Sequence, residues 1–402
     1  MTSIALAGRI LRIKPSPSTA AADRASELKR AGRSIISLVV GEPDFDTPAH
    51  IRAAAAAAME AGATRYTQLA GTPELRKAIA DKLLRENGLT YDPKDIIVTN
   101  GAKSGIYAAF AATLDAGDEV IIPAPFWVSY TDVVLACDGV PVTVPCDEAQ
   151  GFKLTAEQLE AAITPRTRWL ILNSPSNPTG ATYSLEEYAA LAQVLERHPA
   201  VLVMTDDIYE HLRFEGGIAP HFLNAAPQLQ DRTLAINGVS KTYAMTGFRI
   251  GWAAGPSLLI KALDTLLSQA AGNASSVSQA AALAALNGDQ SFVRDNLATY
   301  RQRRDVMAAG INAIPGLSCL VPDGAFYLYV NCAGLIGRTT PEGTVLADDG
   351  MVTLYLLDSV GVAVVAGAAY GLSPYFRIST ATSLDTLQEG LNRIAKAIGQ
   401  LR

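Results

Sequence analysis

The feature of this sequence that most constrains its fold is a regular alternation of short apolar segments with helical segments through the middle of the chain. Helical patterns fall between most of the apolar segments, as where Ser184 and Glu187 match a capping box at a helix start. Alternation of this kind predicts an α/β fold with a mostly parallel sheet covered by helices on both faces. The segments with strand character are 96–99, 119–122, 140–144, 169–172, 201–205, 234–236 and 249–254.

The pattern changes after about residue 290. A long, Arg-rich helical stretch at 292–313 is followed by two expected strands, at 325–330 and 375–379. The chain then continues into an amphipathic helix at 383–400, where leucine and isoleucine recur at helical spacing. We therefore expect a smaller α+β domain after a large α/β domain.

The composition argues against several classes of protein. The formal charge is −6, and no block of like charge marks a nucleic-acid binder. No apolar run predicts a transmembrane helix, and the first residues lack the pattern of a signal peptide. The 4 cysteines and 4 histidines have neither metal-binding spacing nor the density of a disulfide scaffold. We expect a cytoplasmic enzyme with no metal, whose cofactor, if it has one, is organic.

Residues suited to ligand binding follow the first two strands. In an open α/β sheet, ligands bind at the carboxyl ends of the strands. The small-residue turn that includes Ala102 and Lys103 can bind an anion at a helix N-terminus, although a plain helix start explains it equally well. Trp127 can stack on a flat ring or serve as an ordinary core aromatic.

Later strands are followed by an amide, a carboxylate and two cations. Asn177 lies in a rigid turn with two prolines, which leaves an amide free to bind a ligand. Asp206 can hold a protonated ring nitrogen, whereas we expect the adjacent Asp207 to support its turn. Lys241 and Arg249 come next, and a lysine at this place is not expected to be a solvated surface charge.

Six motifs taken together resemble those of the class I aminotransferases, which are pyridoxal 5'-phosphate (PLP) enzymes of fold type I. The motifs are GEPDF at 41–45, NPTG at 177–180, DDIYE at 206–210, SKTYAMTGFRIGW at 240–252, GAFY at 324–327 and FRIS at 376–379. They occur in the family's order, and the resemblance extends from about residue 12 to the end of the chain. It is strongest to the bacterial aspartate aminotransferase subgroup, which includes prephenate and aromatic transaminases.

The resemblance implies a set of residues around the cofactor. Lys241 matches the lysine that joins the cofactor aldehyde and carries a proton during catalysis. Asp206 matches the carboxylate that pairs with the ring nitrogen, and Trp127 matches the aromatic that stacks on the ring. The other implied cofactor contacts are Asn177 and Tyr209 at the phenolate oxygen, and Ala102, Lys103, Ser240 and Arg249 at the phosphate.

The resemblance also implies how the substrate binds. Arg377 matches the arginine that takes the α-carboxylate, for which a planar guanidinium is suited. Lys103 and Lys14 match basic residues linked to a second carboxylate, which favours aspartate. The substrate-binding residues implied in this way are Gly41, Asn177, Arg377, Lys103, Lys14 and Trp127.

The resemblance further implies a homodimer, because Tyr66 matches a tyrosine that reaches the phosphate of the partner subunit. Three departures from the family pattern, at Val40, Thr131 and Ala366, lie outside the catalytic residues and bear on substrate choice. The expected organisation is an N-terminal arm at 1–14, a large PLP-binding domain at 49–290, and a small domain assembled from 15–48 and 291–402.

We therefore expect transamination between an L-amino acid, with aspartate as first choice, and a 2-oxo acid such as 2-oxoglutarate. An aromatic or prephenate transaminase and a PLP-dependent lyase of the same fold remain alternatives. A serine hydrolase can be argued only from the S-x-x-K match at 26–29, which reads as an amphipathic helix. A non-catalytic regulator with this fold is a further alternative.

Overall fold

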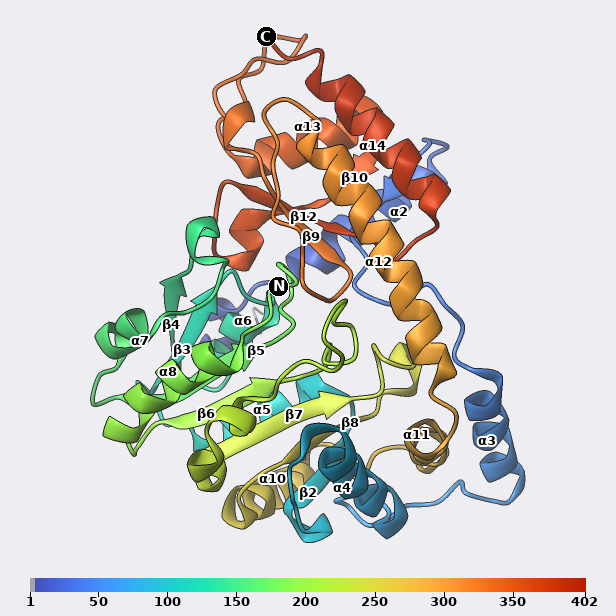
Figure 1. The fold of residues 1–402 in the computed structure, drawn as a ribbon, viewed down its shortest axis with the longest axis vertical. Coiled ribbons are helices and arrows are strands. Elements are labelled where there is room, and N and C mark those ends of the chain that lie inside the picture. The colour runs from blue at the N-terminus through green and yellow to red at the C-terminus, as the bar shows by residue number, and fades with distance from the viewer. Residues whose placement is uncertain (1–3) are drawn as a thin grey trace.

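The structure is a computed structural model that describes residues 4–402. Its largest element is a seven-stranded sheet of order β2-β8-β7-β6-β5-β3-β4 (Figure 1). Strand β8 is antiparallel to β7 and β2, and the remaining neighbours are parallel. All seven expected strands are confirmed, and the sheet is mostly parallel. The strands are β2 (Ile96–Thr99), β3 (Glu119–Ala124), β4 (Val140–Pro145), β5 (Thr167–Asn173), β6 (Leu202–Asp206), β7 (Thr233–Gly238) and β8 (Gly251–Ala254).

Helices cover both faces of this sheet because successive strand side chains point to opposite faces. In β5, Leu170 and Leu172 enter one core, whereas Trp169 and Ile171 enter the other. The first core is completed by α3 (Ala49–Glu60), α4 (Pro73–Asn87), α7 (Ala156–Ala162), α8 (Leu185–Arg197), α9 (Phe222–Ala225) and α11 (Ser276–Asn287). The second core is completed by α5 (Ala102–Thr113), α6 (Ser129–Ala136) and α10 (Ser257–Ala270). Within residues 4–402, none of the helices has the length and apolar character needed to span a membrane.

A smaller layer packs around a separate core in the upper part of Figure 1. Its antiparallel sheet consists of β11 (Val365–Ala366), β12 (Tyr375–Ser379) and β9 (Tyr327–Asn331). Its helices are α2 (Pro17–Arg30), α12 (Ser291–Asn312), α13 (Asp349–Val360) and α14 (Leu384–Ile398). The short strand β1 (Ile36–Ser37) pairs with β10 (Val362–Ala363), so the N-terminal segment joins the C-terminal part of the chain. The proposed domain boundaries stay a prediction.

Candidate active site

A cavity of about 380 Å³ lies where several strands of the large sheet end. Asn173 ends β5, Asp206 ends β6, and Lys241 follows β7, so the strand order itself brings these side chains to one edge. Eleven of the expected site residues line the cavity: Gly41, Ala102, Lys103, Trp127, Asn177, Asp206, Tyr209, Ser240, Lys241, Arg249 and Arg377.

The amine of Lys241 is buried and has a lowered pKa. Burial lowers the pKa of Lys241 to about 8, and the nearby guanidinium groups of Arg249 and Arg377 act in the same direction. Its Nζ donates a hydrogen bond of 2.6 Å to the carbonyl oxygen of Gly41. An amine with this pKa is available in its neutral, nucleophilic form near neutral pH.

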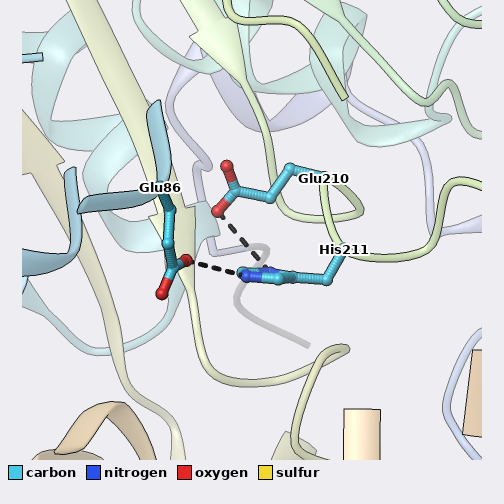
Figure 2. Close-up of side chains that lie close together, drawn as sticks. All are labelled: Glu86, Glu210 and His211. Atoms are coloured by element: carbon cyan, nitrogen blue, oxygen red, sulfur yellow. Dashed lines mark hydrogen bonds and ion pairs between the residues drawn. The ribbon is translucent and has the colours of Figure 1, made fainter. Parts of the chain in front are cut away.

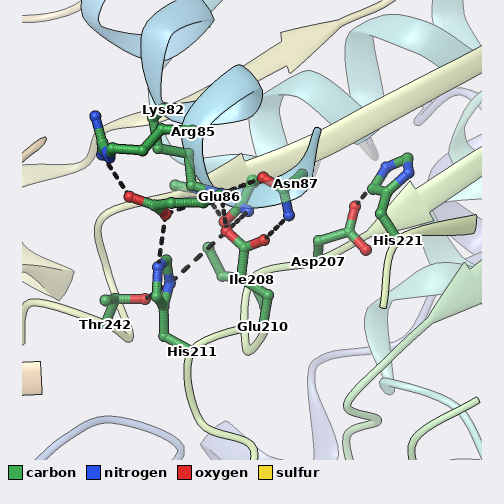
Figure 3. A network of polar contacts seen from close by, with 12 residues as sticks. Lys82, Arg85, Glu86, Asn87, Asp207, Ile208, Glu210, His211, His221 and Thr242 are labelled. Atoms are coloured by element: carbon green, nitrogen blue, oxygen red, sulfur yellow. Dashed lines mark hydrogen bonds and ion pairs between the residues drawn. The ribbon is translucent and has the colours of Figure 1, made fainter. Parts of the chain in front are cut away.

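Asp206 is a buried carboxylate that forms no direct ion pair with any residue of 4–402, although the charge of Lys241 acts on it across the cavity. Burial raises the pKa of Asp206 to about 6, although the hydroxyl of Tyr130 donates a hydrogen bond of 2.6 Å to its Oδ2. The effect of burial outweighs those of Tyr130 and Lys241, so the ionised form is disfavoured and a cation bound directly beside Asp206 would be stabilised there. Asp207 instead contacts Thr205 at 2.7 Å and His221 at 3.2 Å, and Figure 3 shows the second contact. These contacts hold Asp207 against β6 and His221, outside the cavity.

Arg377 has an unused hydrogen-bond donor inside the protein. Its Nη1 donates to Asn177 Oδ1 at 3.0 Å and its Nη2 donates to the carbonyl oxygen of Val39. Its Nε is buried and has no hydrogen-bond partner among residues 4–402, and the guanidinium carbon lies 4.5 Å from the ring centroid of Tyr327. A buried guanidinium with a free donor is suited to binding a carboxylate.

The start of α5 and Arg249 together present groups that are suited to an anion. The first N–H groups of a helix have no acceptor within the helix and attract negative charge. Gly101 has φ +83°, and a Cβ there would lie 2.5 Å from Arg249 Nη2. A Cβ at Gly251 would lie 2.4 Å from the backbone nitrogen of Ala102. Glycine at 101 leaves room for the guanidinium of Arg249 at the helix start, and glycine at 251 lets β8 approach the backbone there.

Lys103 and Trp127 contact each other across the cavity wall. The Nζ of Lys103 lies 4.7 Å from the centroid of the Trp127 ring, which is a cation–π contact. Burial lowers the pKa of Lys103, and Arg249 acts in the same direction. The expected aromatic and the expected cation are therefore neighbours.

Two of the expected site residues do not line the cavity. Tyr66 is 96% exposed and borders a different hollow, together with Arg65 and Gln279. Lys14 is exposed, and its backbone nitrogen donates to Asp132. Within one copy of the chain, neither side chain takes part in the site.

Sequence reasoning missed Tyr327, Tyr130 and Asn173. The hydroxyl of Tyr327 lies 2.7 Å from that of Tyr209, and a Cβ at Gly41 would lie 2.9 Å from it. Asn173 donates to the carbonyl oxygen of Asp206 and accepts from the backbone of Asn177, which fixes two strand ends together. The GAFY motif was the available signal for Tyr327, but no comparable signal existed for Tyr130.

Comparison with known proteins gives consistent matches over most of the chain. Residues 33–394 match the model of the family "Aminotransferase class I and II". An aspartate/prephenate aminotransferase from Cereibacter sphaeroides is 52% identical over 389 residues, which cover 97% of each chain. The solved structure of the aspartate aminotransferase from Rhizobium meliloti is 52% identical, with a TM-score of 0.97 and full coverage of both chains. The aspartate aminotransferase from Thermus thermophilus with maleate is 39% identical, with a TM-score of 0.91 over 98% of this chain and 100% of that one.

Proposed function

The chain belongs to the class I and II aminotransferases, which use pyridoxal phosphate, and from this premise we propose that it transfers an amino group between L-aspartate and a 2-oxo acid such as 2-oxoglutarate. The observation that carries the proposal is the cavity itself. It combines a lysine of lowered pKa, a buried carboxylate of raised pKa and a buried arginine with a free donor. These are an amine, a site for a cation and a site for a carboxylate within one cavity.

The residues present fit the cofactor. Asp206 needs the positive charge that a protonated pyridine nitrogen would bring, because burial otherwise disfavours its ionised form. The region where Gly101 permits Arg249 to approach the start of α5 is suited to a phosphate group. Trp127 offers an aromatic face for the ring. We infer that these residues hold the cofactor, with Ser240 and Tyr209 as further contacts.

Each residue then has a role that follows from its chemistry. When bound, pyridoxal phosphate supplies an aldehyde that combines with amines and a ring that withdraws electrons from the substrate's α-carbon. Lys241, in its neutral form, would move the proton between that α-carbon and the aldehyde carbon of the bound cofactor. Asp206 would keep the ring nitrogen positively charged, and Arg377 would orient the substrate by its α-carboxylate.

The preference for aspartate rests on a second positive charge in the cavity. Lys103 faces the same space as Arg377, so two cations are available to a dicarboxylate. The named activities of the relatives and the maleate in the Thermus thermophilus structure support this choice. Prephenate or an aromatic amino acid is the second candidate, since Trp127 and Val40 also line the cavity and one relative is an aspartate/prephenate enzyme.

A panel of amino donors with 2-oxoglutarate tests the substrate, and Lys103→Ala tests the reason for it. Loss of a charged hydrogen bond should lower kcat/KM for aspartate, which corresponds to about 1–3 kcal/mol of lost transition-state stabilisation. The kcat/KM for phenylalanine and tyrosine should change little. Lys261→Ala, at an exposed site on α10 away from the cavity, is the control. Equal losses for both kinds of donor would show that Lys103 serves the cofactor. Release of pyruvate or carbon dioxide without an acceptor would instead identify a lyase.

We also infer a homodimer with shared active sites. Tyr66 does not line the cavity of its own chain, yet it is almost fully exposed, as a residue that acts on a second copy would be. Other large apolar side chains are also exposed, such as Met59 a few residues before Tyr66 and Leu11 near the N-terminus. A second copy that covers such side chains would remove their cost of exposure to water.

A cytoplasmic location is part of the same proposal. All four cysteines, at positions 137, 146, 319 and 332, are buried free thiols. Free thiols are the state that a reducing compartment maintains. Fractionation of the native host, with this enzyme detected by antibody, would test the location.

A further inference from the structure

A buried polar cluster adjoins the chain segments that carry Tyr209 and Lys241, and Figure 3 shows most of its side chains. Its members come from the end of α4, the turn after β6, the end of β7 and the segment after it. None of them is among the residues that line the cavity, and Lys82, Glu210 and Thr242 are only 1%, 2% and 4% exposed. The cluster consists of Lys82, Glu86, Asn87, Glu210, His211, Asn237 and Thr242.

Part of this cluster has the spacing of a metal site, but it already contains a cation. The ligand atoms of Glu86, Glu210 and His211 lie within 4.8 Å of one another (Figure 2). The ammonium of Lys82 contacts Glu210 directly and lies 3.6 Å from Glu86. Lys82 therefore supplies the positive charge that a metal ion would bring, and we interpret the cluster as an internal ion-pair network.

Glu210 connects α4 to the end of β7. Its carboxylate accepts hydrogen bonds from Asn87 at 2.7 Å and from Asn237 at 2.6 Å. Burial alone would raise the pKa of Glu210, but Lys82 and His211 bring it below its usual value, so the group stays charged. Because Glu210 follows Tyr209 in the chain, these bonds also fix the turn that carries Tyr209.

His211 and Thr242 join that turn to the segment of Lys241. His211 Nε2 lies 2.9 Å from Glu86 Oε2, and its Nδ1 lies 3.2 Å from Thr242 Oγ1. Thr242 is adjacent to Lys241 in the chain, and its hydroxyl has this contact with the ring. A side-chain hydrogen bond thus links two cavity-lining segments that come from different strands.

We propose that Thr242 and His211 are positioning residues for the transaminase reaction. Their hydrogen bond, supported by the ion pairs of Lys82, Glu86 and Glu210, fixes the amine of Lys241 relative to Tyr209 and Asp206. Thr242 acts through the position of Lys241 and touches no substrate. Loss of its hydroxyl should therefore change the protonation and reactivity of Lys241 more than the binding of substrate by Arg377.

The test compares Thr242→Val, which keeps the shape but removes the hydroxyl, with Thr242→Ser, which keeps the hydroxyl. Thr233→Val is the matched control, because Thr233 is also buried and donates one hydrogen bond, to the carbonyl oxygen of Leu229 at 2.8 Å, at the opposite end of β7. Two quantities are measured on each holoenzyme. One is the pH at which the absorbance band of the bound cofactor shifts, without substrate, and the other is the pair kcat and KM.

We expect Thr242→Val to move the spectral midpoint by about half a pH unit or more and to lower kcat about three- to tenfold, with KM within about twofold. Thr242→Ser should restore both, and Thr233→Val should leave both unchanged even if it unfolds more easily. An unchanged midpoint and kcat in Thr242→Val would overturn the proposal, as would the same changes in Thr233→Val or a failure of Thr242→Ser to restore them. If Thr242→Val does not fold, His211→Gln removes the same contact from the other side. A shifted midpoint with a lowered kcat in His211→Gln would then support the proposal, and an unchanged midpoint and kcat would overturn it. The spectral readout needs no amino acid, so it does not depend on aspartate being the substrate.

Discussion

The roles of single residues in this enzyme follow from what burial does to their charges. Lys241 and Asp206 lie in one cavity. Burial lowers the pKa of Lys241 and raises the pKa of Asp206, so the neutral form of each is favoured. The amine gains reactivity from this shift, whereas the carboxylate gains affinity for a cation. The same environment thus prepares two residues for opposite tasks.

Asp206→Asn should leave the cofactor bound but lower kcat by at least about a hundredfold, because an amide cannot keep the ring nitrogen positively charged. Steady-state kinetics and the cofactor absorbance of the purified variant measure both effects. The matched control is Asp207→Asn, which changes the neighbouring carboxylate outside the cavity and should stay within about threefold of the wild type. A similar small change in Asp206→Asn would contradict the assigned role, since threefold is less than about 1 kcal/mol of barrier.

The sequence could predict most of the site residues but not how they contact each other. The residues that follow the strands predicted Lys241 and Asp206 at one edge of the sheet, and the family resemblance added Arg377. The hydrogen bond from Tyr130 to Asp206 joins residues 76 positions apart, and no periodic pattern encodes it. The network around Lys82 was missed for the same reason, because buried polar partners are set by tertiary packing.

At the scale of elements, glycines fix the turns that carry the site. Gly180, in the turn after β5, has φ +70°, and a Cβ there would lie 2.3 Å from the carbonyl oxygen of Gly324. The turn of Asn177 is therefore packed directly against the segment that leads to Tyr327. Two motifs that are far apart in the sequence thus meet through backbone contact.

Gly180→Ala should destabilise the protein by about 2–4 kcal/mol, since it combines backbone strain at positive φ with a steric clash. Gly217→Ala is the control, because Gly217 has φ +79° but open space around it, and it should cost only about 1 kcal/mol. Urea denaturation of the two variants measures the difference. Equal losses of unfolding free energy in the two variants would show that the close contact with Gly324 does not contribute to the cost.

The elements that the sequence predicted well are those with long, regular patterns. The strands at 96–254 and the helix α14 follow from apolar alternation and helical spacing. The strands β1, β10 and β11 each have only two residues, too few for any periodicity to reveal. Strand β1 pairs with β10, which lies more than 300 residues away in the chain, and local sequence cannot specify such a partner.

At the scale of the whole molecule, the main expectation is an active site completed by a second subunit. Mixing Lys241→Ala with Tyr66→Ala and allowing subunit exchange should restore activity, because one of the two sites in each mixed dimer would then have both residues. The control pairs Lys241→Ala with Arg377→Ala, which belong to the same site and should not complement. An active enzyme that light scattering shows to be strictly monomeric would refute the shared site.

The central claim is that Lys241 carries the cofactor, and its most direct test is chemical. Borohydride reduction of the holoenzyme fixes the cofactor to the amine that holds it, and mass spectrometry of a digest locates the modified lysine. We predict a single modified peptide that contains Lys241, with Lys241→Ala folded, almost inactive and unmodified. Modification at Lys103 or at any other lysine, with Lys241 left free, would contradict the account.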